Sequence, residues 1–454
     1  MRFKLVTQTQ APGLHCKVNL PASLIQKANR MKPGTLNFDG IDYLDGKVSD
    51  PILMGWMQGS PPPVDKRIRF EDDRSLGFPQ NRWTLSHLRE LVPTVNIWRG
   101  NRSASDLGAI NTALAADIDA LTFTDMGGNT RVWADSLIDT YTDGIVVLHR
   151  GKRVFERYTG ALKPHMPHAA FSITKSYAAT LAATLVHEGV LDEMKRVPYY
   201  LPELAHTAYA DATLRQVMDM QIGVAYSELY SDPKAQIWDH ARAGSIRARP
   251  ALYTGASNFY EFLQTLQKEG EHGQAFAYKT VNTDVLCWVM KRVTGIALAD
   301  MMSDRIWQRL GCEEDAHISV DSIGVPFGGG GLCASLRDMA RFGDMMRCEG
   351  VALGQQVIPA AVVADIAKGE SPTKFAKAGY HLLPGFSYRN MWWNTHNEHG
   401  AFEARGIHGQ RIYVAPKAEM VIARFGSHPI ASSAANDPIT LHAFLALGRM
   451  LMKA

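Results

Sequence analysis

A long apolar helix that begins at Ser172-Ile-Thr-Lys175 constrains this sequence more than any other stretch. Residues 172–188 are mostly small or apolar and contain no Gly or Pro, and Gly189 follows as a C-terminal stop. Ser172 and Lys175 are three residues apart, so on a helix they share one face and their side chains can meet. Free backbone N–H groups in the first helical turn can stabilise an oxyanion. The pair therefore predicts a serine nucleophile with a lysine base.

The Ser-x-x-Lys spacing is not specific by itself. It occurs twice more, at Ser231–Lys234 and Ser371–Lys374, and both of these copies contain a proline in polar surroundings. Only the first copy opens a long apolar helix. A helix N-cap serine beside a solvated lysine remains the alternative when the motif is considered alone.

Composition is typical of an ordinary globular protein. The chain has 454 residues, of which 46% are hydrophobic and 20% charged. This length is enough for two domains or one large two-lobed unit. The net charge of +3 is nearly neutral, so we expect neither nucleic acid nor a membrane as a partner. No stretch of 18 consecutive apolar residues predicts a membrane span.

Cysteine usage and the N-terminus predict a cytoplasmic location. The cysteines are odd in number and widely spaced, and none forms a Cys-x-x-Cys pair, which favours idle thiols over a disulfide frame or a zinc site. The first ten residues lack the apolar segment of a secretory signal. The cysteines are Cys16, Cys287, Cys312, Cys333 and Cys348.

The pattern along the chain predicts an α+β fold, with an antiparallel sheet flanked by helices and an inserted all-helical lobe. Residues 1–105 are punctuated by Pro and Gly but carry several tryptophans, which predicts an ordered arm packed on the main body. Residues 106–190 and 321–454 are expected to form the α/β lobe. Residues 191–320 are expected to form the helical lobe.

Two β-hairpins and several helices are predicted within these regions. The hairpins pair 144–149 with 153–158 and 411–415 with 420–425. Four glycines at 328–331 allow a close approach of the backbone, and Ser335 to Asp338 fits a capping box for the following helix. Other helices are expected at 84–91, 105–119, 212–220, 258–268, 283–294, 299–310 and 437–451.

A serine–lysine hydrolase needs a neutral lysine and a further hydroxyl that moves the proton to the leaving group. Tyr278 is the candidate for this hydroxyl, because it lies just before the helix expected from Thr283 and so projects from a loop. An aromatic residue beside a helix start is more often a packing residue. Position alone therefore leaves both interpretations of Tyr278 open.

Four stretches, at 171–175, 212–220, 278–288 and 329–342, occur in an order that is more specific than any one of them. Together they resemble the serine β-lactamase-like hydrolases of the class C, penicillin-binding-protein and esterase type. Within that group the sequence is similar to the 6-aminohexanoate-dimer (nylon-oligomer) hydrolases and related carboxylesterases. The resemblance covers residues from about 50 to 454, and it implies a β-lactamase/transpeptidase-like fold with the site between two lobes.

The resemblance also implies a role for individual residues. Ser172 would be the nucleophile, Lys175 the base and Tyr278 the proton relay. The backbone N–H groups of Ser172 and Ile407 would hold the oxyanion, and His408 would lie near the pocket. No cofactor and no metal are expected.

Two departures from the family pattern bear on the substrate. The second motif is commonly Tyr-x-Asn, and here it is Tyr278-Lys-Thr280. The third is commonly Lys-Thr-Gly or His-Thr-Gly, and the matching stretch here contains Arg405 and Gly406. The missing amide and the missing cation favour esters or linear amides over β-lactams, with Arg405 as a partial substitute for the cation.

Two aromatic residues are predicted to bind substrate. The stretch 226–233 resembles an acidic, aromatic loop of the nylon-oligomer hydrolases, in which Tyr230 matches a tyrosine that helps with amide substrates. The departing nitrogen of an amide must be protonated, so an extra hydroxyl matters most for amides. Trp393 is predicted to line the cleft. Packing in the interior is the alternative for both residues.

The predicted function is a serine hydrolase that cleaves an ester or linear amide bond of a small molecule through an acyl-enzyme on Ser172. The alternatives are a β-lactamase or D-Ala-D-Ala carboxypeptidase, and a non-catalytic binding protein on the same fold. The sequence is compatible with a homodimer. The histidine pairs at 165/168 and 396/399 lack a clear third ligand, so a metal site is not expected.

Overall fold

The computed structural model describes residues 34–38, 40–72 and 74–453. The predictions that concern the first ten residues and Cys16 lie outside these residues.

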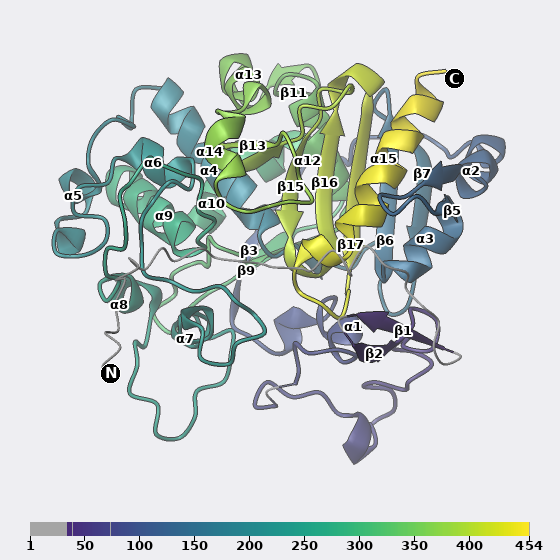
Figure 1. Ribbon diagram of the computed structural model, residues 1–454, viewed down its shortest axis with the longest axis horizontal. Coiled ribbons are helices and arrows are strands. Elements are labelled where there is room, and N and C mark those ends of the chain that lie inside the picture. Colours follow the sequence, from purple (N-terminus) through teal and green to yellow (C-terminus); the bar gives the residue numbers. More distant parts are fainter. Residues whose placement is uncertain (1–33, 39, 73, 454) are drawn as a thin grey trace, which may run out of the picture.

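A seven-stranded antiparallel sheet takes its strands from distant parts of the chain (Figure 1). The order across the sheet is β13-β14-β15-β16-β17-β6-β7, so the early hairpin lies directly beside the late strand β17. Both predicted hairpins are confirmed, as β6–β7 and β16–β17. The strands are β6 (Thr142–His149), β7 (Lys152–Tyr158), β13 (Ser387–Arg389), β14 (Trp392–Asn394), β15 (Phe402–Gly406), β16 (Gln410–Ala415) and β17 (Met420–Gly426).

Helices cover both faces of this sheet, and alternate residues of its central strands pack into two separate cores. Val146 and Leu148 of β6 belong to the core that contains α4 and α12, whereas Ile145 and Val147 belong to the core that contains α3 and α15. Burial on both faces explains why β6 is continuously apolar. The α+β prediction is confirmed. The helices are α2 (Thr112–Asp119), α3 (Trp133–Asp139), α4 (Ile173–His187), α12 (Leu336–Arg347) and α15 (Asp437–Leu451).

Short helices joined by loops lie beside the sheet, where α9 packs against α4 and α6 (Figure 1). The chain then leaves this part through β9 (Ala316–Ser319), which joins a second sheet of order β3-β9-β10-β8. The predicted domain boundaries stay predictions. The helices are α5 (Val197–Tyr200), α6 (Leu214–Met218), α7 (Gln236–Ala243), α8 (Phe259–Leu263), α9 (Val281–Thr294), α10 (Leu298–Met302) and α11 (Gln308–Leu310).

The remaining elements are short. The second sheet contains β3 (Thr94–Ile97), β8 (His168–Ala169) and β10 (Leu332–Ala334) beside β9. Three two-stranded pairs are β1 (Thr35–Phe38) with β2 (Ile41–Leu44), β4 (Thr122–Thr124) with β5 (Thr130–Val132), and β11 (Val351–Ala352) with β12 (Gln355–Gln356). The short helices are α1 (Asn81–Thr84), α13 (Ala360–Lys368) and α14 (Pro372–Ala376).

Several predicted helices are shorter in the structure. The helix expected at 84–91 is wrong, because the chain forms only α1 and a separate 3-10 turn at Leu88–Glu90. The helix expected from residue 105 begins at Thr112. The backbone N–H of Ser105 instead donates to the Gly311 carbonyl at 2.8 Å, so a tertiary contact uses a group that a helix would need. The helix at 299–310 contains a π-helical turn, Ser303–Trp307.

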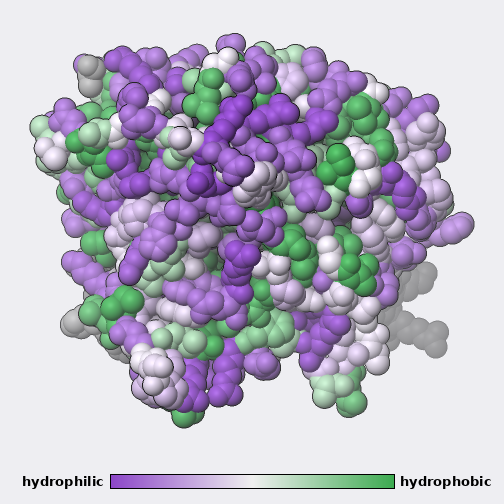
Figure 2. Space-filling view, turned by 180° about the vertical axis from the view of Figure 1, so that it is seen from behind, coloured by the Kyte–Doolittle hydropathy of each residue, from purple (hydrophilic) through white to green (hydrophobic). Residues whose placement is uncertain are grey.

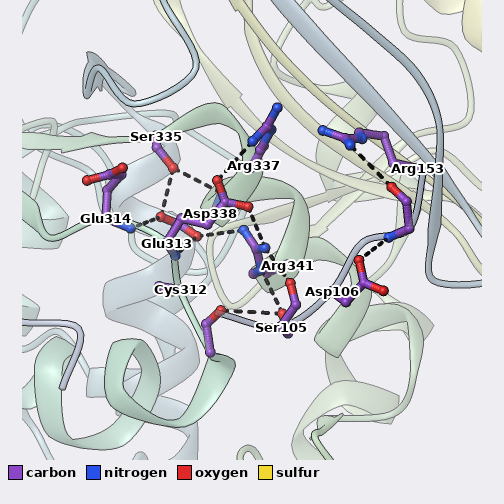
Figure 3. A network of polar contacts seen from close by, with 12 residues as sticks. Ser105, Asp106, Arg153, Cys312, Glu313, Glu314, Ser335, Arg337, Asp338 and Arg341 are labelled. Atoms are coloured by element: carbon purple, nitrogen blue, oxygen red, sulfur yellow. Dashed lines mark hydrogen bonds and ion pairs between the residues drawn. The ribbon is translucent and has the colours of Figure 1, made fainter. Parts of the chain in front are cut away.

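A buried network fastens the 105 region to α12 (Figure 3). The carboxylate of Asp338, which is fully buried, accepts from the backbone N–H groups of Glu313 and Glu314 at 2.8 and 3.0 Å and from the Ser335 hydroxyl at 2.7 Å. Arg341 lies 2.9 Å from the same carboxylate and donates to the Ser105 hydroxyl at 2.7 Å. The Ser335 side chain also accepts from the Asp338 N–H, so the N-cap half of the predicted capping box is present.

The face seen in Figure 2 is mainly hydrophilic, and its apolar residues form separate small patches. None of the helices in the described part of the chain is both long and apolar enough to cross a membrane.

Replacement of Asp338 should destabilise the protein strongly. Asp338→Ala removes the acceptor of two backbone N–H groups and leaves the buried Arg341 with Glu313 as its remaining carboxylate partner, so we expect a loss of about 2–4 kcal/mol in the free energy of unfolding. Asp344→Ala is the control, because Asp344 pairs with Arg347 on the same helix but is partly exposed, and should cost less than about 1 kcal/mol. Equal urea midpoints for the two variants would contradict this prediction.

Candidate active site

Ser172 lies at the N-terminus of α4, where the chain turns sharply into the helix. Phe171, which precedes it, has a φ of 47°, a left-handed conformation that a bulky residue adopts only when its surroundings enforce it. The N–H groups of Ile173 and Thr174 bond to the carbonyls of Ala170 and Phe171. Among the described residues, the turn and loop hydrogen bonds include none from the Ser172 N–H. That group is therefore placed to meet an oxyanion.

The ammonium group of Lys175 is buried against Ser172. Its Nζ lies 2.8 Å from Ser172 Oγ and 2.5 Å from the Gly329 carbonyl oxygen, and the side chain is 1% exposed. Burial lowers the pKa of Lys175 to about 8, against the opposing effect of the Glu228 and Asp284 carboxylates. A measurable fraction is thus neutral at pH 7. The neutral amine can accept the Ser172 proton while it still donates to Gly329.

Tyr278, which lies just before α9, completes the group. Its hydroxyl hydrogen-bonds with Ser172, and Lys175 Nζ lies 5.1 Å from the centre of its ring. Burial raises the pKa of Tyr278 well above the usual value for tyrosine, so the phenol keeps its proton at neutral pH. The structure therefore brings together the three residues for which the sequence predicted catalytic roles, with a proton donor and a proton acceptor on the same hydroxyl.

The end of β15 lies against the turn that precedes Ser172. A Cβ atom on Gly406 would lie 2.6 Å from the Ala170 carbonyl oxygen, so only glycine allows this approach. Ile407 follows directly, and a role for its N–H in the oxyanion hole stays a prediction. His408 has a φ of 62° and its Nδ1 lies 2.7 Å from the His428 carbonyl oxygen. The His408 ring lies 5.7 Å from the Phe171 ring, so it supports the turn at the nucleophile.

Trp393 packs beside Tyr278 in a group of aromatic rings. The ring centres of Trp393 and Tyr278 are 5.6 Å apart, and Trp393 is 6% exposed. Tyr230 is half-buried, with its ring 5.7 Å from that of Trp238. Burial raises the pKa of Tyr230 well above the usual value for tyrosine, and the Glu228 carboxylate and Tyr278 add to this rise. A substrate-binding role for Tyr230, Trp393 and His408 stays a prediction.

Both departures from the family motifs have a structural consequence. The Arg405 guanidinium lies 2.8 Å from Glu403 and 4.9 Å from the Trp393 ring, and it also pairs with Asp437. Two carboxylates thus compensate its charge inside the protein. Thr280 occupies the position of the motif asparagine and is buried. Its methyl group packs against Gly329, and a Cβ atom added to Gly329 would lie 2.4 Å from this methyl group.

Three further residues at the site were not assigned roles from the sequence. The Gly329 carbonyl accepts a hydrogen bond from Lys175, and the Glu228 and Asp284 carboxylates favour the charged form of Lys175. The run of four glycines is the signal that could have located the first. An acid inside the apolar helix α9 marks Asp284, whereas nothing in the loop sequence distinguishes Glu228 from a solvated carboxylate.

One histidine of each pair is engaged in another contact. His168 Nε2 lies 3.3 Å from Asp143 Oδ2, and His396 Nε2 lies 2.7 Å from the Ser387 hydroxyl. In the described ranges, no three or more His, Cys, Asp or Glu side chains gather in a group able to hold a metal ion.

Comparison with known proteins places this arrangement among related chains. Residues 134–442 match the Beta-lactamase family model. The chain is 34% identical over 366 residues to the 6-aminohexanoate-dimer hydrolase of Paenarthrobacter ureafaciens, covering 80% of this chain and 88% of that one. A Bacillus anthracis structure with the provisional name 6-aminohexanoate-dimer hydrolase superposes with a TM-score of 0.78 at 30% identity, covering 86% and 99%. A Bacillus halodurans penicillin-binding protein shares the fold, with a TM-score of 0.52 at 13% identity, covering 68% and 99%.

The pKa of Lys175 should appear in the pH dependence of the reaction. Only the unprotonated amine accepts a proton, so kcat/KM for a neutral ester should rise with pH and level off above about pH 8. Lys175→Met should lower kcat by about 10²–10⁴-fold and remove this rise. A rise centred near the ordinary lysine value of about 10.4 would contradict the prediction.

Tyr278→Phe should separate amide from ester substrates. An amide nitrogen must be protonated as it departs, whereas p-nitrophenolate leaves as a stable anion. We therefore expect kcat for a linear amide to fall by about 10²–10⁴-fold and kcat for a p-nitrophenyl ester to fall far less. Tyr388→Phe is the control, since Tyr388 belongs to the same aromatic group and its ring lies 6.3 Å from that of Tyr278. Equal losses on the two substrates would rule out the proton-donor role.

Proposed function

This chain belongs to the Beta-lactamase family and is a serine hydrolase of amide or ester bonds, and we propose that its acyl-enzyme forms on Ser172. One observation carries the proposal. Lys175, a side chain that is almost never fully buried without a function or a partner, is 1% exposed and hydrogen-bonds to the Ser172 hydroxyl at 2.8 Å.

The reaction follows from the positions of these groups. Ser172 Oγ attacks the carbonyl carbon while its proton passes to neutral Lys175. The backbone N–H groups of Ser172 and Ile407 stabilise the oxyanion, and Tyr278 donates the proton that the departing amine or alcohol needs. Lys175 restores the Tyr278 proton. Water then attacks the acyl-enzyme by the same path in reverse, so that the acid leaves and Ser172 regains its proton.

We propose linear amides and esters with an apolar chain as the substrate class. Two observations support this choice over β-lactams: the motif amide is replaced by Thr280, and the Arg405 charge is compensated by Glu403 and Asp437. A cavity of about 190 Å³ is lined by residues between 372 and 385, among them Phe375 and Tyr380, and its lining does not include Ser172, Lys175 or Tyr278. Its Tyr380 ring lies 5.4 Å from that of Trp393, which suits a flexible apolar chain.

We also propose that the enzyme works in the cytoplasm. The support is its cysteines, because the described ones are free thiols and three of them, Cys287, Cys312 and Cys333, are buried. A homodimer, and the absence of nucleic-acid and membrane partners, stay predictions.

A covalent probe and a substrate panel test the proposal together. Intact-mass spectrometry should find one fluorophosphonate adduct on the folded protein, mapped to Ser172 by peptide digestion and lost in Ser172→Ala. The wild type should cleave a p-nitrophenyl ester and a linear 6-aminohexanoate dimer, and nitrocefin should have the lowest kcat/KM of the three. Ser231→Ala, in a second Ser-x-x-Lys copy, is the matched control and should behave as the wild type.

Two results would contradict this assignment. A folded protein without an adduct at Ser172 would exclude the acyl-enzyme. Nitrocefin turnover equal to that of the ester would return the assignment to a β-lactamase.

A further inference from the structure

The reaction described above does not explain why the carbonyl that contacts the lysine base lies in a run of four consecutive glycines. A Cβ atom at three of these four positions would collide with its neighbours: on Gly328 it would lie 2.3 Å from Cys287 Sγ, and on Gly331 2.6 Å from Ser319 Oγ. On Gly329 it would lie 2.4 Å from the Thr280 methyl group. Gly328 and Gly329 are therefore pressed against α9 and the residue before it, whereas Gly331 packs against β9, and the Gly329 carbonyl contacts Lys175.

A chain of buried polar contacts continues behind Gly329, away from the nucleophile. The Gly329 N–H donates to Asp284 Oδ1 at 3.1 Å, and Asp284 Oδ2 lies 3.1 Å from His240 Nε2. His240 Nδ1 lies 2.9 Å from the Tyr226 hydroxyl. With the tyrosine as donor to Nδ1, His240 carries its ring proton on Nε2, and this atom and Asp284 Oδ2 are in close contact without the alignment of a hydrogen bond.

Apolar rings enclose His240 and make this contact rigid. His240 is fully buried, its ring stacks on Phe262 at 5.0 Å, and the Phe259 and Phe327 rings lie 5.3 and 5.6 Å away. Asp284 is 4% exposed. In such surroundings water does not replace a lost partner, so the geometry of Asp284 depends on His240.

We propose that Asp284 and His240 are positioning residues that hold Gly329 against Lys175 and set the proton affinity of the base. Asp284 acts in two ways. Its hydrogen bond fixes the residue whose carbonyl anchors the Lys175 ammonium, and its negative charge favours the protonated amine. The inference rests on the proposed function, because it assigns these residues to the Lys175 base of that reaction.

Other charged groups also act on Lys175, so a test must separate their effect from that of Asp284. Glu228 also favours the protonated form of Lys175, and its carboxylate accepts from the Thr280 N–H. The negative charge of Asp284 also adds to the rise that burial causes in the pKa of four surrounding side chains, Tyr209, Tyr226, Tyr260 and Cys287.

Asp284→Asn tests the charge while it keeps the shape. The amide oxygen still accepts from Gly329, but the negative charge that favours protonated Lys175 is gone. The rise of kcat/KM with pH should therefore move to lower pH, by about 1 unit. Asp321→Asn is the matched control, because Asp321 is equally buried and accepts the Phe259, Ile323 and Val325 N–H groups without contact to Gly329.

The direction of the shift distinguishes positioning from a merely structural role. A loosened site that admits water would move the rise towards higher pH, and a rise unchanged from the wild type would mean that Asp284 has no influence on the base. Either result overturns the proposal. A wild type that forms no adduct at Ser172 refutes the proposed function instead, so the two failures are distinguishable.

A second pair of variants tests the chain if Asp284→Asn does not fold. His240→Gln can place an amide N–H near the position of Nε2, whereas His240→Leu cannot donate. We expect kcat to fall by about 10-fold or more in His240→Leu with KM little changed, and His240→Gln to recover most of the loss. Equal kcat values in the two variants would overturn the role of His240.

Discussion

The buried ammonium group of Lys175 is the constraint on which the rest of the site depends. A lysine at 1% exposure is stable only when its donors are satisfied, and here the Ser172 hydroxyl and the Gly329 carbonyl accept from it. Burial lowers the pKa of Lys175 to about 8, which suits a base that works near neutral pH. The same desolvation that destabilises the charged lysine therefore creates its chemical role.

The packing of the fold serves this burial. Helix α4 lies between the seven-stranded sheet and α9, so that Lys175 is enclosed by elements from both parts of the molecule. Glycines permit the closest approaches: Gly406 brings the end of β15 to Ala170, and Gly329 brings a carbonyl to Lys175. A side chain at either glycine would prevent this close approach of the backbone. The position of the base is thus fixed by backbone groups, which are more rigid than side chains.

Much of the fold was predictable from local pattern. The two hairpins, α4, α9 and α15 have strong periodicity or clear stop signals, and the structure confirms them. The helix predicted at 84–91 was wrong, and the one predicted at 105–119 was too long because the contact of Ser105 with Gly311 uses a backbone group that a longer helix requires. Propensity cannot anticipate this, since the competing partner lies about 200 residues away in the chain.

The sequence by itself determined the chemistry of the site: a serine and a lysine three residues apart on an apolar helix, and a tyrosine before a second helix. Spacing within one element is a local property, so it is readable without a fold. Only the tertiary structure decided which groups tune that chemistry. Asp284, Glu228 and His240 act through space, and Arg405 is compensated by Glu403 and Asp437 rather than presented to a substrate. Electrostatic influence depends on distance and burial, and neither is written in the order of the residues.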